Sequence, residues 1–160
     1  MISQTIYHIA LITHLIGLTS VAGTTLVDYV VTKQFWRQHA SDKTKGLAIQ
    51  QALSRFPILF GVGFLFLIVS GVYMMYVTNG AYGEQIWFRI KFGLIILIIV
   101  NGVVFGRRQG SKLKKVLSEE IPGSNSEATL LKIKANLNLF HLSQLLFFLT
   151  ILTLSVFKFN

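Results

Sequence analysis

Four long apolar stretches constrain the fold of this chain more than any other feature of its sequence. They lie near Ile6–Val31, Arg55–Thr78, Gln85–Gly106 and Ala135–Phe157. A helix needs about 20 residues to cross the hydrocarbon core of a bilayer, and each stretch is long enough. Strands of an open sheet would leave backbone groups unsatisfied in lipid, so each stretch is predicted to be a helix. The expected fold is an all-α integral membrane four-helix bundle, formed by residues 1–160 as a single four-span domain.

The composition favours the same class of protein. The chain is 52% hydrophobic and only 13% charged, whereas a soluble domain carries about 25% charged residues. The first apolar stretch has no basic segment before it and no clear cleavage site after it, so we expect a retained helix rather than a signal peptide. The chain has no cysteine, which excludes disulfides, thiolate catalysis and iron–sulfur ligation.

Basic side chains are concentrated in two of the three loops between these stretches. They are Lys33, Arg37, Lys43, Lys45 and Arg55 in the first loop, and Arg107, Arg108, Lys112, Lys114, Lys115, Lys132 and Lys134 in the third. The positive-inside rule predicts that both long loops are cytoplasmic and both termini outside, with the chain in a bacterial inner membrane. The net charge of +9 is therefore interpreted as membrane orientation and contact with anionic lipid, and no nucleic-acid partner is expected.

Local turn signals predict the connections between the helices. Asn79–Gly80 and Gly83 indicate a short turn between the second and third stretches, so these two are expected to pack as an antiparallel hairpin. Residues 111–117 are predicted to extend the third helix beyond the membrane, and residues 121–126 to interrupt the chain. Apolar spacing then predicts that the fourth helix begins before its membrane span.

Three histidines lie within the predicted spans, namely His8, His14 and His141. His8 and His14 are six residues apart, which on a helix corresponds to about 9 Å of rise and about 120° of rotation. They therefore point to different faces, and the spacing excludes a two-histidine metal site on one helix face. His14 is predicted near the midplane and His141 nearer the cytoplasmic side. The two can ligate one haem only if a helix shifts or tilts, or if they meet across a dimer.

Other polar residues are predicted at the levels of these histidines. Lys91 is expected in the outer half near His8, and a buried lysine there must snorkel, pair or lose its proton. Arg55 and Asp28 are expected near the level of His141, where an arginine could meet a haem propionate. Asn138 and Gln144 lie one turn on either side of His141 and are interpreted as a polar stripe.

Two segments resemble a group of small four-span bacterial membrane proteins. The segments run from Phe56-Pro57 through Ser70-Gly71, and from Trp87 to Lys91 at the start of the third span. The group includes the HemJ-type protoporphyrinogen oxidases and the CopD-like copper-resistance proteins. The resemblance implies a four-span fold with bound haem b, in which Lys91 and a first-span histidine, either His8 or His14, are the key residues. The sequence departs from the HemJ pattern because neither histidine is followed by the expected tryptophan.

These features together predict a membrane protein that binds haem b for electron transfer or haem-dependent redox chemistry, with HemJ-like porphyrinogen oxidation as one form of it. The candidate cofactor-binding residues are His8, His14, His141, Lys91 and Arg55, and the candidate iron ligands are the three histidines. Whether the chain is an enzyme stays open, as do the haem count and the redox partner, quinone or porphyrin. A homodimer is expected, because four short spans leave little interior for a macrocycle.

Two alternatives from other functional classes stay open. One is a cofactor-free or copper-handling membrane transporter that uses His8 with Met74 and Met75 on the outer side. The other is a structural or assembly subunit, in which the buried polar side chains link helices by hydrogen bonds.

Overall fold

The computed structural model describes residues 2–118 and 124–157, and within these ranges the chain is helical with no strand. The helices in chain order are α1 (Ile2–Ser41), α2 (Lys43–Leu53), α3 (Phe56–Val77), α4 (Ile86–Val100), the π-helix η1 (Asn101–Arg107), α5 (Arg108–Ser118) and α6 (Ser124–Phe157). The predicted all-α class is confirmed. Helix α5 contains the predicted extension at residues 111–117. Residues 121–123 of the predicted interruption lie outside the described part, and the prediction is wrong for residues 124–126, which form the start of α6.

Four helical runs are long and apolar enough to cross a membrane. They are Gln4–Ser41, Thr44–Val77, Ile86–Ser118 and Glu127–Phe157. Their apolar side chains face outward to an extent that water would not tolerate, as with Ile58 at 70% exposed and Leu131 at 66% exposed. Such a surface is matched by lipid tails, and the chain is therefore a multi-pass membrane protein.

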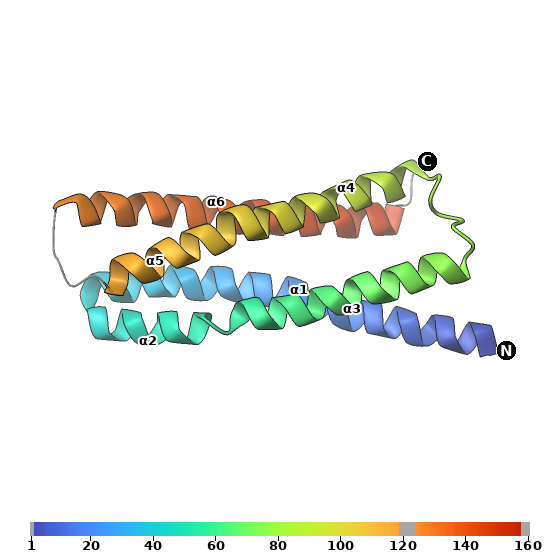
Figure 1. The fold of residues 1–160 in the computed structure, drawn as a ribbon, viewed down its shortest axis with the longest axis horizontal. Helices are drawn as coiled ribbons and strands as arrows, with labels where there is room; N and C mark the ends of the chain where they lie inside the picture. The colour runs from blue at the N-terminus through green and yellow to red at the C-terminus, as the bar shows by residue number, and fades with distance from the viewer. Residues whose placement is uncertain (1, 119–123, 158–160) are drawn as a thin grey trace.

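The four runs lie side by side and give the molecule two distinct ends (Figure 1). The start of α1, the connection between α3 and α4 and the end of α6 share one end, which we call the turn end. Helices α2 and α5 lie at the opposite end, together with residues 32–41 of α1 and 127–137 of α6. We call this opposite end the basic end, because the lysine and arginine side chains are concentrated there.

Helix α3 packs mainly against α1, and the closest approach is between two glycines. A Cβ atom added to Gly17 would lie 2.8 Å from the carbonyl oxygen of Gly63. A Cβ atom added to Gly63 would lie 2.8 Å from the Cβ of Ser20. Only glycine permits backbones to come this near, which is a common way to join helices in lipid.

The predicted turn between α3 and α4 forms, but the predicted packing of these helices is wrong. Asn79 and Gly80 adopt the positive φ angles of 51° and 73° that a tight turn uses. Beyond the turn, α3 packs on α1 while α4 packs on α6, so the two halves of the expected hairpin separate. The glycine contact draws α3 toward α1, and Asn101 at the end of α4 bonds to α6.

Two clusters of buried apolar side chains hold the bundle together. Val21, Ile98, Phe148 and Ile151 join α1, α4 and α6 in the middle of the molecule. Phe35, Leu113, Ile133 and Leu137 join α1, α5 and α6 at the basic end. The candidate site lies beside these clusters.

Candidate functional site

A cleft of about 690 Å³ lies between α3 on one side and the α4–η1–α5 run on the other, with α1 and α6 behind it. Most of its lining is apolar. Its polar residues include Asp28 on α1, His141 and Gln144 on α6, and Arg107 and Lys114 toward the basic end. The cleft exists because α3 and α4 each pack on a different partner helix.

His141 is the most enclosed titratable side chain of the cleft, at 2% exposed. Its Nδ1 atom lies 2.7 Å from the carbonyl oxygen of Leu137. A carbonyl oxygen only accepts, so Nδ1 carries a hydrogen and donates it. This bond runs to the preceding turn of the same helix and fixes the orientation of the ring.

The second nitrogen of His141 meets Asp28 across the cleft. The distance from Nε2 to Oδ2 of Asp28 is 3.0 Å. Because Nδ1 already donates, a close contact here requires one proton shared between Nε2 and the carboxyl oxygen. The pair is either an imidazolium with a carboxylate or a neutral ring accepting from a carboxylic acid. In both forms it is a buried polar link between α1 and α6.

A second polar link joins the end of α4 to α6. The side-chain nitrogen of Asn101 donates to Oε1 of Gln144 at 2.8 Å and lies 3.1 Å from the hydroxyl of Ser143. Gln144 is 1% exposed, and its Nε2 has no hydrogen-bond partner in the described part of the chain. An unsatisfied buried donor costs about 1–3 kcal/mol. This amide is therefore a donor available to a ligand one turn from His141.

Three glycines in the lining of the cleft leave space where a side chain would otherwise stand. Gly61 on α3, Gly102 on η1 and Gly110 on α5 line it, and a Cβ atom added to any of them would meet nothing within 4 Å. Gly106 differs, because its added Cβ would lie 2.8 Å from the ring of Phe140. Packing within the chain thus explains Gly106 but not the other three. These three leave flat backbone surfaces on both sides of an open space.

The cleft has positive charge toward the basic end. Arg107 and Lys114 line it there, and Asp28 is its one carboxylate among the described lining residues. A ligand with carboxylate groups would find cationic partners at this end of the cleft. The sequence reasoning missed these two residues and chose Arg55 instead. Gly102 and Gly110, eight residues apart and both without a neighbour for an added Cβ, were the available signal in this part of the chain.

His14 lies outside this cleft, in the contact between α1 and α3. The ring is half-buried, with Nδ1 3.0 Å from the hydroxyl oxygen of Ser70. The Ser70 hydroxyl donates to the carbonyl oxygen of Phe66, so its oxygen accepts from Nδ1 of His14. Lys91 on α4 is close enough to interact electrostatically with His14.

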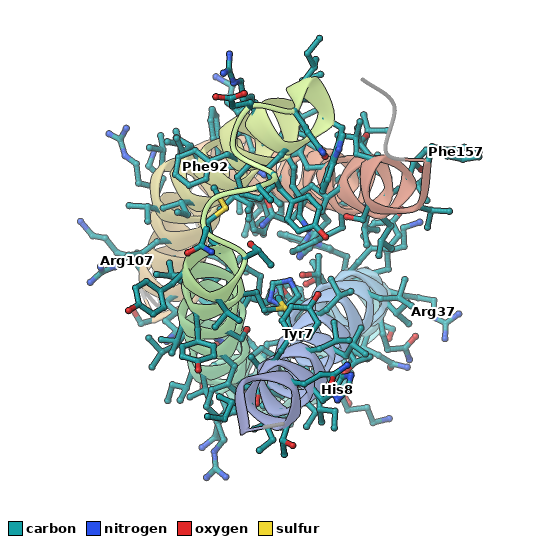
Figure 2. The ribbon with its side chains drawn as sticks, turned by 90° about the vertical axis from the view of Figure 1, so that its right-hand side faces the viewer. Tyr7, His8, Arg37, Phe92, Arg107 and Phe157 are labelled. Carbon is teal, nitrogen blue, oxygen red and sulfur yellow. The ribbon has the colours of Figure 1, made fainter. Side chains whose placement is uncertain are left out.

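The remaining predicted site residues are not brought into the cleft. His8 is exposed on the outer side of α1, in edge contact with its neighbour Tyr7 (Figure 2). Arg55 is exposed just before α3 and does not line the cleft. Asn138 is exposed and belongs to a different groove, so the polar stripe of α6 divides between two sites.

The described residues contain no group of three or more histidine, aspartate or glutamate side chains that could hold a metal ion. Of the two methionines in the copper-handling alternative, Met75 has its methyl group near Gly83 in the turn between α3 and α4.

Comparisons with protein-family models, curated proteins and solved structures return no match to this chain. The resemblance to the HemJ-type and CopD-like proteins therefore stays a prediction from the sequence.

Proposed function

We propose that this chain is a membrane protein that would hold haem b in the cleft with His141 as a ligand of its iron, and that it serves electron transfer or haem-dependent redox chemistry. The observation that carries the proposal is the hydrogen bond from Nδ1 of His141 to the carbonyl oxygen of Leu137. Metal-ligating histidines commonly donate their other ring N–H in this way, which fixes the ring and raises its basicity. His141 lines the cleft, and its other nitrogen, Nε2, is the atom that would bind the iron in place of Asp28.

The shape of the cleft supports a planar ligand. Its volume of about 690 Å³ falls within the usual range for cofactor pockets, about 300–1,000 Å³. Gly61, Gly102 and Gly110 leave open space where a side chain would otherwise stand. The unpaired amide of Gln144 offers a hydrogen bond near the ligating nitrogen.

The charge of the cleft supports a ligand with propionate groups. Arg107 and Lys114 would hold the carboxylates toward the basic end, and Lys114 can reach the membrane surface by its flexible stem. When bound, the haem would supply one-electron chemistry at its iron, with a potential set by the axial ligand, burial and nearby hydrogen bonds.

Asp28 competes for the proposed ligating nitrogen. Its carboxyl group contacts Nε2 of His141, and its side chain is 30% exposed, so it has room to turn aside. In the proposal Asp28 stabilises the ring of His141 while the cleft is free. Binding of Nε2 to iron would require Asp28 to turn aside and the shared proton to stay on its carboxyl group or to pass to solvent.

The proposal keeps the location predicted from the charges, with the basic end in the cytoplasm of a bacterium and both termini outside. Because the chain has no cysteine, single cysteines can report the orientation. A cysteine at Ser41 should be shielded from an impermeant thiol reagent in intact cells, and one at Asn79 should react. The reverse labelling would invert the topology. A homodimer and an unidentified redox partner, quinone or porphyrin belong to the same proposal.

The haem proposal is tested by the absorption spectrum of protein purified from haem-replete cells. The wild-type chain should show a Soret band, His141→Ala should lose it, and His8→Ala should keep it because His8 is exposed and outside the cleft. A colourless wild-type protein, or a His141→Ala variant with unchanged haem content, would contradict the proposal.

One observation favours a second candidate, a cofactor-free structural or assembly subunit. Nε2 of His141 already has a partner in Asp28, and in this second candidate the pair serves only as a hydrogen-bonded link between α1 and α6. The two functions predict different effects of Asp28→Ala. Under the haem proposal this variant binds haem more tightly, because a competing carboxylate is gone. Under the structural alternative no haem binds at all, and the substitution only lowers thermal stability.

A further inference from the structure

A second hollow lies on a neighbouring face of α1, between α1 and α6 at the basic end. This groove has a volume of about 930 Å³ and is lined by residues 29–40 of α1 and 131–138 of α6. Thr32 lines both the groove and the cleft, but His141 and the glycines do not line the groove. The groove is therefore a separate site from the candidate haem cleft.

Three cations and no carboxylate line this groove among the described residues. The cations are Lys33 and Arg37 from α1 and Lys134 from α6. Figure 2 shows Arg37 on the outer side of α1, directed away from α3. Like charges gathered around one concave surface repel each other and raise the local concentration of anions. The groove is thus complementary to a negatively charged ligand.

Aromatic rings position two of these cations. Nζ of Lys33 lies 4.3 Å from the ring centre of Tyr29, and Nζ of Lys134 lies 6.0 Å from the ring centre of Trp36. The indole nitrogen of Trp36 is buried and has no hydrogen-bond acceptor in the described structure. An indole N–H only donates, so an oxygen-bearing ligand would offset its cost.

The groove lies at the level where lipid head groups are expected. Tyr29 lies near the end of the first apolar stretch, and Lys134 comes just before the fourth. Tryptophan and tyrosine concentrate at the membrane–water interface, with lysine and arginine on its cytoplasmic side. Exposed apolar side chains continue along both helices toward the turn end, including Leu26 and Leu142. A ligand here would meet cations at one end and lipid-facing apolar surface at the other.

We infer that this groove binds an anionic phospholipid, with its phosphate held by Lys33, Arg37 and Lys134 and its acyl chains along α1 and α6. Basic hollows between helices on the cytoplasmic side are suited to such head groups. The inference does not depend on haem. The site would tie the protein to the acidic lipid of its membrane and stabilise the contact between α1 and α6.

The test compares thermal unfolding of the detergent-solubilised full chain with added phosphatidylglycerol or phosphatidylcholine. A ligand that binds only the folded state raises the unfolding temperature with its concentration. Phosphatidylglycerol should stabilise the wild-type chain more than phosphatidylcholine. The triple variant K33Q/R37Q/K134Q should lose this difference, because three removed cations weaken binding on the order of a hundredfold.

A charge-matched control distinguishes a site from diffuse attraction. The variant R108Q/K112Q/K132Q removes three exposed cations of the basic end that do not line the groove, so it should keep the preference for phosphatidylglycerol. Equal loss in both triple variants would overturn the site. Equal stabilisation by inorganic phosphate would overturn the lipid as its occupant.

A second measurement covers the case in which the groove variant fails to fold. Native mass spectrometry of the wild-type chain during delipidation should show phosphatidylglycerol retained after phosphatidylcholine is lost. Simultaneous loss of the two lipids would contradict the inference.

Discussion

Two intramembrane histidines of this chain have opposite surroundings, although the sequence presents them alike. His141 is 2% exposed and its two nitrogens face oxygen atoms of Leu137 and Asp28. His14 is half-buried, bonds by one nitrogen to the hydroxyl of Ser70, and has the side chain of Lys91 rather than a carboxylate as its titratable neighbour. One ring is oriented by its own helix, and the other by a neighbouring helix.

The comparison shows that a histidine in a membrane span is defined by its partners. A ring oriented by a carbonyl of its own helix keeps its position when the neighbouring helices move. His141 also lines the cleft, and in the proposal a ligand reaches its Nε2 once Asp28 turns aside. His14 does not line the cleft, and its Nδ1 is bound to the hydroxyl of Ser70 on α3. We therefore propose His141 as the haem ligand and a helix-linking role for His14.

The largest expected difference between the two histidines is in their contributions to the free energy of unfolding. His141→Ala removes a buried ring and leaves Asp28 without its partner, which should lower the free energy of unfolding by about 3 kcal/mol. His14→Ala should cost about 1 kcal/mol, the value of one hydrogen bond with partial burial. Both are measured on haem-free protein in detergent by thermal or denaturant unfolding. Equal losses for the two variants would remove the distinction.

The second prediction concerns the helix contact that orients His14. Gly17→Ala puts a methyl group against the backbone of Gly63, so we expect a loss of about 1–3 kcal/mol. Gly23→Ala on the same helix meets nothing within 4 Å and is the matched control. It should be neutral or stabilise by up to about 1 kcal/mol, because alanine favours a helix. A Gly17→Ala protein as stable as Gly23→Ala would mean that α1 and α3 do not approach as described.

Much of the fold was predictable because it depends on local sequence. Apolar length specified four spanning helices, and Asn79–Gly80 specified the turn between α3 and α4. The pairing of helices was not predictable from that turn. Apolar faces gain little from pairing in lipid, so small contacts decide which helices meet. Here the contact between Gly17 and Gly63, which are far apart in the sequence, is the close contact that joins α1 and α3.

The candidate site was predictable only in part for the same reason. His141 and Asp28 could be assigned to a similar depth by counting residues from the loops, and they do meet. Depth does not give the direction in which a side chain points around its helix. His8 and Arg55 were therefore predicted as site residues, but they lie outside the cleft. Arg107 and Lys114 line the cleft and were not predicted as site residues. The π-helix η1, which carries Gly102 into the cleft, has no simple sequence signal.

The third prediction isolates the hydroxyl that binds His14. Ser70→Ala removes the acceptor for Nδ1 and should cost about 0.5–1.5 kcal/mol, the usual value of one such bond. The haem content and spectrum should not change. Thr153→Ala is the control, because its hydroxyl bonds only to the backbone of its own helix at Leu149. Loss of haem from Ser70→Ala would bring His14 into the ligand set.

The fourth prediction is a variant with the smallest expected effect on stability and a large expected effect on haem binding. Gly110→Leu fills open space in the cleft without a clash at its Cβ. Leucine is the better helix former, so stability should stay the same or rise by up to about 1 kcal/mol. Haem content should nevertheless fall sharply, because the side chain occupies the proposed site. Stable Gly110→Leu protein with full haem content would show that the ligand lies elsewhere.

The most direct measurement is the spectrum of His141→Gly protein with and without imidazole. The variant should purify without a Soret band, and added haem with imidazole should restore one, because free imidazole can replace the missing ring. His14→Gly should keep the wild-type spectrum without imidazole. A His141→Gly protein that retains the wild-type haem spectrum in the absence of imidazole would contradict the assignment of His141 as the ligand.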